Sequence, residues 1–169
     1  KEFQGIHNRS DWDLKRHGEF SGSDFTHTDL ETGESYIPHV AEYSIGLNRL
    51  MLVVIADAYR SDENRTWLAL SPKLAPFKAA VFPLLRNKPE LVEKARGIYE
   101  TLVAEGIPVN WDDRGNIGKR YLAQDEIGTP LCITVDFDTL ENNSVTIRNR
   151  DTMQQDRVDV DTIKEYIVS

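Results

Sequence analysis

The segment IPHVAEYSIGLNR (residues 37–49) runs directly into the apolar run LMLVVIADAY (residues 50–59), and this stretch decides the fold of the first part of the chain. Its first half has β-branched and aromatic residues at intervals and Pro38 near its start, which predicts a strand. Gly46 interrupts that strand. The second half is long, apolar and poor in turn residues, which favours a buried helix. The sequence therefore predicts a strand that meets the N-terminus of a helix at Gly46.

The junction carries groups suited to an anionic ligand. Glycine lets a ligand approach the backbone, and the free N–H groups at a helix start favour phosphate. Arg49 falls in the first helical turn, where the helix dipole disfavours a cation, so its presence there points to a ligand that it meets. Glu42 and Ser44 lie on one face of the strand and together could hold an ammonium group. The alternative is a core strand, a glycine turn and a surface arginine.

The octapeptide EYSIGLNR (residues 42–49), followed by an apolar helix, resembles motif 3 of the class II aminoacyl-tRNA synthetases in the form found in glycyl-tRNA synthetases. Other segments extend the resemblance over nearly the whole chain, in the expected order: EFQGI (2–6), RSDWDL (9–14), LAPFKAAVFPL (74–84), DDRGNIGKRY (112–121) and QDEIGTP (124–130). The first two are similar to the catalytic strand before motif 3. The last three are similar to that family's anticodon-binding domain.

The resemblance implies two sets of ligand-binding residues. The first would contact ATP: Glu2, Phe3, Gly46, Leu47, Asn48 and Arg49. The second would contact glycine: Glu42, Tyr43, Ser44, Ile45 and Gly46. In this scheme Arg49 stacks on the adenine, while Glu42 and Ser44 hold the α-ammonium group of glycine through charge-assisted hydrogen bonds. The other glycine-site residues would shape a pocket too small for a side chain.

The implied reaction is attack of the glycine carboxylate on the α-phosphate of ATP, then transfer of glycine to the 3′ end of tRNA(Gly). Mg²⁺ would enter with ATP and offset its phosphate charge. No metal site in the protein is expected, because the four histidines are spaced too irregularly for zinc and no cysteine lies nearby. Two positions depart from the family pattern: Tyr43 replaces the usual proline, and Asn48 replaces the usual aspartate.

Two stretches of polar or turn-forming residues, DENR (62–65) and SPKLAP (71–76), predict a domain boundary, with domains at residues 1–66 and 67–169. DENR is expected to be a linker or exposed loop. Strands are predicted in the second domain at 78–84, 108–112, 131–136, 144–150 and 157–160, helices at 89–105, 117–127 and 161–167, and a turn at 141–143. The fold class is therefore α/β: the remnant of an α+β catalytic domain with antiparallel strands, then a mixed-sheet α/β anticodon-binding domain, whose residues from about Leu74 are expected to fold independently.

The net charge of −8 argues against a nucleic-acid-binding surface over the whole chain. Arg114, Lys119 and Arg120 nevertheless cluster in one segment, and the resemblance implies that they contact the anticodon of tRNA(Gly). The alternative is that they are solvated charges beside glycine turns. A second cluster, of Arg148, Arg150 and Arg157, could form another basic face. Tyr121 suits either base stacking or the core.

The composition, with 40% hydrophobic and 28% charged residues, is that of an ordinary globular protein. The single cysteine rules out a disulfide within the chain, no apolar run is long enough to cross a membrane, and a cytoplasmic location is expected. The chain opens on Lys1 inside a predicted strand, so we expect a piece of a longer protein. The resemblance implies that the longer protein is a homodimeric glycine–tRNA ligase and that this piece is inactive alone. The alternative is a non-catalytic nucleic-acid-binding homologue, such as a polymerase accessory subunit. Retention of Glu42, Ser44, Gly46 and Arg49 together favours the enzyme.

Overall fold

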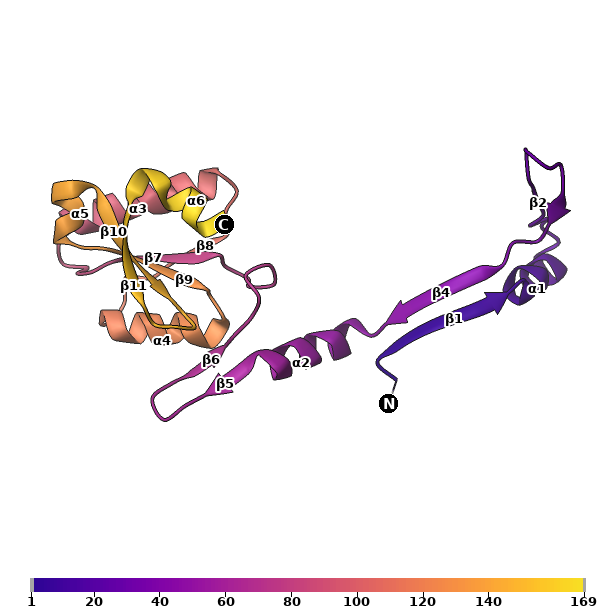
Figure 1. Cartoon of the computed structure of the whole chain (residues 1–169), viewed down its shortest axis with the longest axis horizontal. Coiled ribbons are helices and arrows are strands. Elements are labelled where there is room, and N and C mark those ends of the chain that lie inside the picture. The colour runs from indigo at the N-terminus through magenta and orange to yellow at the C-terminus, as the bar shows by residue number, and fades with distance from the viewer. Residues whose placement is uncertain (1, 169) are drawn as a thin grey trace. The chain divides into compact units, whose positions relative to one another are not determined.

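The computed structural model describes residues 2–168, and the chain divides into two compact units, Lys1–Val53 and Val54–Ser169 (Figure 1). We call them the first and the second unit. The division falls inside one helix, α2 (Leu47–Ala58), which is therefore shared by both units. The boundary predicted at residues 66 and 67 lies further along the chain and stays a prediction.

The first unit is built on an antiparallel pair of strands, as predicted. It contains β1 (Gln4–Ser10), α1 (Trp12–Ser21), β2 (His27–Thr28), β3 (Ser35–Tyr36), β4 (Val40–Ile45) and the first half of α2. β1 pairs with β4 and β2 with β3. The register of the longer pair shifts between Asn8 and Ser10, where Ser10 has a positive φ of 51°. Ser10 is the last residue of β1, so the irregularity lies at the end of that strand.

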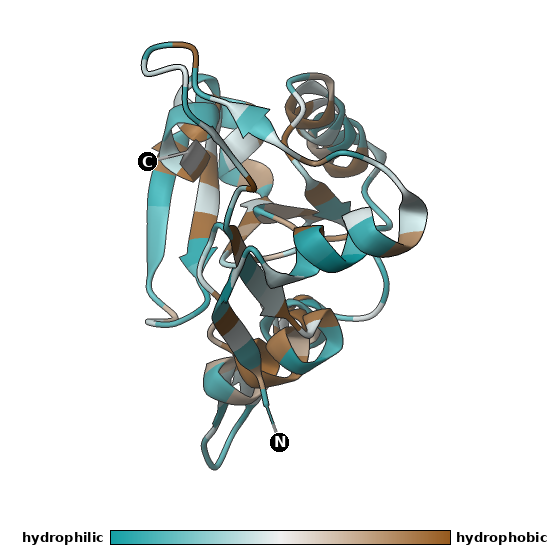
Figure 2. Ribbon diagram, turned by 90° about the vertical axis from the view of Figure 1, so that its right-hand side faces the viewer, coloured by the Kyte–Doolittle hydropathy of each residue, from teal (hydrophilic) through white to brown (hydrophobic). Residues whose placement is uncertain are grey.

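Helix α2 forms over the predicted residues, but the expectation that it is buried is wrong for the part of the chain that the structure describes. Leu47, Met51 and Leu52 are 74%, 59% and 66% exposed, and Ala58 is the one buried residue of the helix. Figure 2 shows the apolar residues of the ribbon in brown. A helix that is apolar nearly all round needs several neighbouring elements to cover it, and a two-stranded sheet supplies too little surface.

The second unit is a mixed α/β fold around one five-stranded sheet. After the end of α2 come β5 (Tyr59–Ser61), β6 (Thr66–Leu68), β7 (Ala79–Pro83), α3 (Pro89–Ala104), β8 (Val109–Trp111), α4 (Ile117–Ile127), β9 (Leu131–Val135), α5 (Phe137–Asn142), β10 (Ser144–Asn149), β11 (Gln155–Asp159), the 3₁₀ turn η1 (Val160–Thr162) and α6 (Ile163–Val168). The strand order in the sheet is β11-β10-β9-β7-β8. β7 is parallel to β8 and β9, and β10 is antiparallel to β9 and β11, which confirms the predicted mixed sheet.

The core lies on both faces of this sheet. All five residues of β7 are buried, so its side chains supply alternate faces. On one face Ala79 and Val81 belong to a cluster with the inner residues of α3 and with Ile163 of α6. On the other face Ala80, Phe82 and Cys132 pack against α4. Figure 1 shows α3, α5 and α6 on one side of the sheet and α4 on the other.

Two helices of the second unit, α3 and α4, begin and end at residues with local start and stop signals. α3 starts at Pro89 and is followed by Gly106 with a φ of +77°, as the sequence predicts. α4 is capped by Asn116 and ends at Gly128, where φ is +82°. Tyr121 of α4 packs edge-on against Phe82, with ring centroids 5.9 Å apart, so its place is in the core.

Three sequence predictions for this unit need correction. Residues 141 and 142 of the turn predicted at 141–143 belong to α5, which begins with a capping box between Asp136 and Thr139 and has Asn143 as its C-cap. The DENR stretch forms the turn between β5 and β6: its first three residues are exposed, as the loop alternative predicts, but its last residue, Arg65, is buried. The last helix, predicted at 161–167, begins two residues later, at Ile163; Asp161 lies inside η1, which is capped by the side chain of Asp159.

Candidate functional site

The predicted junction of strand and helix is present at Gly46. β4 ends at Ile45 and α2 begins at Leu47. The Gly46 N–H donates to the Phe3 carbonyl at 3.4 Å, which ties the junction to the residue before β1. The Gly46 carbonyl accepts from the Leu50 N–H at 2.8 Å, which closes the first turn of the helix. The structure therefore brings together residues that the sequence places in two separate segments.

Arg49 lies in the first turn of α2, and its guanidinium reaches back to the start of the chain. Its Nη1 donates to the backbone carbonyl of Glu2. A Cβ at position 46 would lie 3.4 Å from Arg49 Cδ, in ordinary contact with the stem of the arginine. Arg49 is exposed, as are the neighbouring Leu47 and Asn48. An exposed guanidinium beside free N–H groups offers a flat cationic surface to an aromatic ring or a phosphate.

Glu42 and Ser44 share one face of the β1–β4 pair, as their spacing predicts. In the antiparallel register Gly5 lies opposite Ser44, and His7 lies opposite Glu42. A Cβ at Gly5 would lie 2.5 Å from His7 Nε2, 3.0 Å from Glu2 Oε1 and 3.0 Å from Ser44 Oγ. Glycine at this position therefore allows three polar side chains to converge over the backbone of β1.

Arg9 is a neighbour of the site that the sequence analysis missed. Its Nη1 lies 3.2 Å from Glu42 Oε2, and its Nε and Nη2 donate to the Asp13 carboxylate at 2.6 and 2.9 Å. Hydrogen bonding from Arg9 lowers the pKa of Asp13, so this carboxylate stays charged. Glu42 already faces one cation, and an arriving ammonium group would share it with Arg9. The contact of Arg9 with Glu42 depends on the pairing of β1 with β4, which no local sequence pattern shows.

Tyr43 and Ile45 lie on the opposite face of β4, because side chains alternate along a strand. They are 63% and 37% exposed, and Tyr43 lies opposite Ile6 of β1. The structure does not bring these two side chains to the face that carries Glu42 and Ser44. On that face, the space available to a ligand is set by the polar side chains that approach Gly5, and not by Tyr43 or Ile45.

The loop between β8 and α4 (residues 112–116) is organised by Arg120. This side chain is 2% exposed, and burial lowers the pKa of its guanidinium. It donates to four backbone carbonyls: Pro83 at 2.6 Å, Asp113 at 3.2 Å, Arg114 at 3.0 Å and Gly115 at 3.0 Å. The interpretation of Arg120 as a solvated charge is therefore wrong, since its donors are committed to the loop backbone.

Arg114 and Lys119 are the exposed members of this basic cluster. The side chain of Arg114 is 85% exposed, and its Nε lies 3.1 Å from Asp112 Oδ1. Lys119 is exposed in the first turn of α4, and its backbone N–H donates to the capping Asn116 Oδ1 at 2.9 Å. Both cations lie beside a helix N-terminus, which adds favourable N–H groups for a phosphate.

The second predicted basic face, that of Arg148, Arg150 and Arg157, is not present at the surface. Arg148 and Arg150 are 6% and 2% exposed. Arg157 is the more accessible of the three, and its Nη2 donates to Asp136 Oδ1 at 2.8 Å. The arginines do not form a free basic face because each has an acidic partner: Arg148 pairs with the buried Asp125, Arg150 with the adjacent Asp151, and Arg157 with Asp136 and Asp138.

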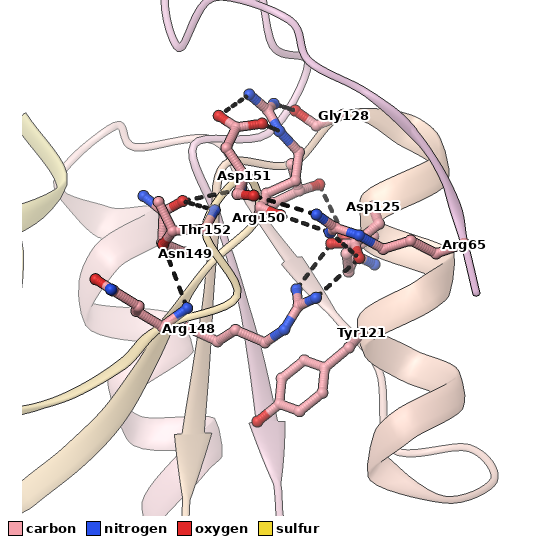
Figure 3. Close-up of polar contacts among 12 residues, drawn as sticks. Arg65, Tyr121, Asp125, Gly128, Arg148, Asn149, Arg150, Asp151 and Thr152 are labelled. Carbon is pink, nitrogen blue, oxygen red and sulfur yellow. Dashed lines mark hydrogen bonds and ion pairs between the residues drawn. The ribbon is translucent and has the colours of Figure 1, made fainter. Parts of the chain in front are cut away.

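Arg148 and Arg150 belong instead to a buried polar cluster around Asp125 of α4, drawn in Figure 3. Asp125 is fully buried and accepts from Arg148 Nη1 at 2.8 Å, Arg148 Nη2 at 2.9 Å and Arg65 Nη1 at 2.8 Å. Arg150 donates to the carbonyls of Gly128 at 2.7 Å and Leu70 at 2.9 Å. The cluster joins the β5–β6 hairpin to α4 and β10, so it supports the fold of the second unit.

Within residues 2–168, no group of three or more histidine, cysteine, aspartate or glutamate side chains is arranged to hold a metal ion. None of the helices described there is both long and apolar enough to pass through a bilayer.

Comparison with known proteins matches both units. Over its whole length the chain is similar to proteins named glycine–tRNA ligase: it is 48% identical to that of Streptomyces coelicolor over 177 aligned residues, covering 99% of this chain and 38% of the relative. It is 48% identical to that of Bifidobacterium longum (99% and 36%) and 49% identical to that of Caldanaerobacter subterraneus (98% and 36%). The chain thus spans a little more than a third of the length of these relatives. These matches confirm the resemblance to glycyl-tRNA synthetases.

The family profile described as the anticodon binding domain matches residues 78–169. This span begins just before β7 and contains the whole five-stranded sheet, with α3 and α6 on one face and α4 on the other. The exposed Arg114 and Lys119 lie within the matched span, and so does Asp125, the centre of the buried cluster. The chain belongs to the anticodon binding domain family.

Proposed function

We propose that this chain is part of a glycine–tRNA ligase, an enzyme that uses ATP to attach glycine to tRNA(Gly). One observation carries the proposal: three relatives of that name match 98% or more of the chain at 48–49% identity. The family match alone would fit any protein that binds an anticodon. The alternative of a non-catalytic homologue finds no specific support in the structure, whereas the arrangement around Gly46 suits the enzyme.

The first unit would supply part of the ATP site. Arg49 would stack its guanidinium on the adenine, because it is exposed and held across the junction by its bond to the Glu2 carbonyl. The backbone from Gly46 to Asn48 would approach the nucleotide at the start of α2. Phe3 would close on the same nucleotide from the neighbouring strand. Mg²⁺ would belong to the ATP substrate rather than to the protein.

Glycine would lie on the β1–β4 face that carries Glu42 and Ser44. The Glu42 carboxylate would accept from the α-ammonium group, and the Ser44 hydroxyl would accept a second hydrogen bond from it. Arg9, 3.2 Å from Glu42, would hold that carboxylate in place. Tyr43 and Ile45 lie on the opposite face, so they would affect the glycine site indirectly, by fixing the position of strand β4. Gly46, at the end of the strand, would leave room beside the substrate.

The second unit would bind the anticodon arm of tRNA(Gly). Arg114 and Lys119 would contact phosphates or bases, because both are exposed at the N-terminus of α4. Arg120 would hold the 112–116 loop that presents them. We propose that the full-length protein is a cytoplasmic homodimer and that glycine, ATP and tRNA(Gly) are its substrates.

The proposal is tested with the full-length protein from which the chain derives. Amino-acid-dependent exchange of pyrophosphate into ATP is measured with each standard amino acid in turn. We expect exchange with glycine and none above background with alanine or serine, because the site favours the smallest side chain. Exchange driven by another amino acid would contradict the assignment of substrate. Absence of exchange with every amino acid, in a protein that still binds tRNA, would support the non-catalytic alternative.

A further inference from the structure

The second unit contains a groove that the proposed function does not use. It lies between α3 and the segment formed by η1 and α6, and has a volume of about 720 Å³. Ile98 and Leu102 of α3 and Ile163 of α6 form an apolar floor that is continuous with the core. Glu90, Glu93 and Asp161 lie among the lining residues nearer to solvent.

Gly97 makes room for this groove. It lies in the middle of the 16-residue helix α3, where glycine is less favourable than alanine by about 1 kcal/mol. No atom lies within 4 Å of where its Cβ would be, so neither crowding nor backbone geometry within the chain requires glycine there. A larger side chain at this position would project into the groove. The glycine therefore keeps open a volume that the described part of the chain does not fill.

The charges around the groove favour a cationic occupant. Of the two lysines that line it, Lys164 pairs with Glu105, whereas Lys94 donates to the neutral amide oxygen Asn143 Oδ1 at 2.8 Å and keeps its positive charge. Within residues 2–168, no lysine or arginine forms an ion pair with Glu90, Glu93 or Asp161. These three carboxylates outnumber Lys94, so the lining keeps a net negative charge that Lys94 offsets only in part. Charged side chains at such a rim steer an oppositely charged partner and select against a like-charged one.

We propose that this groove docks a short segment of a partner protein in which apolar side chains are flanked by lysine or arginine. The apolar side chains would lie over the groove floor, where Ile98, Leu102 and Ile163 are only 6%, 4% and 2% exposed, and the cations would reach the glutamates of α3. Nucleic acid is disfavoured at this surface because phosphates would face unpaired carboxylates. The groove lies on the face of the sheet opposite α4, which carries Lys119 (Figure 1). The partner and an anticodon arm can therefore occupy the unit together.

The test uses the 169-residue chain and a fluorescein-labelled peptide, Lys-Leu-Leu-Lys-Lys-Leu-Leu-Lys, followed by fluorescence anisotropy. The same peptide with glutamate in place of lysine is the reference probe. We expect saturable binding of the cationic peptide and none of the acidic one. Gly97→Leu fills the groove and Glu90→Lys with Glu93→Lys reverses its rim, and each change should weaken binding about ten-fold or more.

A matched control keeps the net charge of the double variant. Glu63→Lys with Glu126→Lys changes two exposed carboxylates on the β5–β6 turn and on α4, away from the groove, and should leave binding within about two-fold. Leucine is a better helix former than glycine, so Gly97→Leu should melt at the same temperature as the parent chain or higher. Equal loss of binding in the control variant would overturn the proposal. So would displacement of the peptide by butylamine at the same concentration, which would indicate a small-amine site.

Discussion

Arg65 and Asp125, which are 60 residues apart in the sequence, form a buried ion pair in which Arg65 Nη1 lies 2.8 Å from Asp125 Oδ2. The same guanidinium donates to the Arg150 carbonyl at 2.6 Å and lies 4.1 Å from the centroid of the Trp67 ring. The family match begins only at residue 78. The β5–β6 hairpin lies before that match in the sequence. A buried ion pair thus anchors the hairpin to the rest of the second unit.

Arg65→Ala should destabilise the second unit. The change leaves Asp125 buried with Arg148 as its remaining ion-pair partner among the described residues, and breaking a buried pair costs about 3 kcal/mol. Urea unfolding followed by circular dichroism measures the free energy of unfolding. Arg60→Ala, on the exposed strand of the same hairpin, is the control and should stay within about 0.5 kcal/mol of the parent. Equal effects of the two changes would show that the buried pair contributes nothing.

A fragment of residues 54–169 should be more stable than one of residues 74–169. The shorter fragment lacks Arg65 and also lacks the Leu70 carbonyl that accepts from Arg150. It further exposes Gly128, whose backbone approaches Leu70 and Leu68 closely. Thermal unfolding of both fragments provides the comparison. We expect both to unfold cooperatively, the shorter one at a lower temperature, and equal midpoints would mean that the hairpin is dispensable.

Cys132 should resist alkylation in the folded chain. Burial raises the pKa of its thiol from 9.0 to about 12, so the folded state favours the neutral form. Because the pKa is raised on folding, this contribution to stability is complete below pH 9 and is lost as the pH rises toward about 12. Iodoacetamide labelling at pH 8, read by mass spectrometry, should be slow in buffer and fast in urea. Rapid labelling of the folded chain would contradict the burial.

Arg49→Ala in the full-length protein should weaken the ATP-dependent step. A guanidinium stacked on a desolvated ring contributes about 2 kcal/mol, which corresponds to roughly thirty-fold in kcat/KM for ATP. Arg60→Ala, near the other end of α2, is the matched control and should leave the value unchanged. Pyrophosphate exchange at several ATP concentrations provides the measurement. An unchanged kcat/KM for ATP in Arg49→Ala would mean that Arg49 is only a surface residue.

The elements of the second unit follow largely from local signals in the sequence. Pro89 and Gly106 bracket α3, and the apolar strand runs predict β7 and β9. α5 escaped prediction because a helix of six residues is too short to show a period, although Asp136 and Thr139 carry its capping signal. The β5–β6 hairpin escaped because its three-residue strands lie beside polar turn residues.

The candidate sites were predictable where spacing alone decides, and not where distant partners decide. Alternation along one strand puts Glu42 and Ser44 on one face, and it equally puts Tyr43 on the other. Arg120 and Lys119 are adjacent in the sequence, yet the first is buried and the second exposed. Their difference depends on the loop carbonyls that Arg120 satisfies, which no local pattern shows.

Single substitutions test which residues of the second unit contact the anticodon arm. Arg114→Ala and Lys119→Ala should each weaken binding of a tRNA(Gly) anticodon stem-loop, and should lower the salt slope by about one. Lys73→Ala, at an exposed position before β7, is the control. Few phosphate contacts are available in so acidic a chain, so weak binding with a shallow salt dependence is expected. Unchanged binding in both variants would place the reading surface elsewhere.

The most direct measurement of the central claim is a titration of the chain with two stem-loops, one with the glycine anticodon and one with altered anticodon bases, at several salt concentrations. We expect the glycine stem-loop to bind more tightly at every salt concentration, because unstacked bases rather than phosphates supply the discrimination. Equal affinity for the two stem-loops would contradict the assignment of this chain to a glycine–tRNA ligase that reads its anticodon.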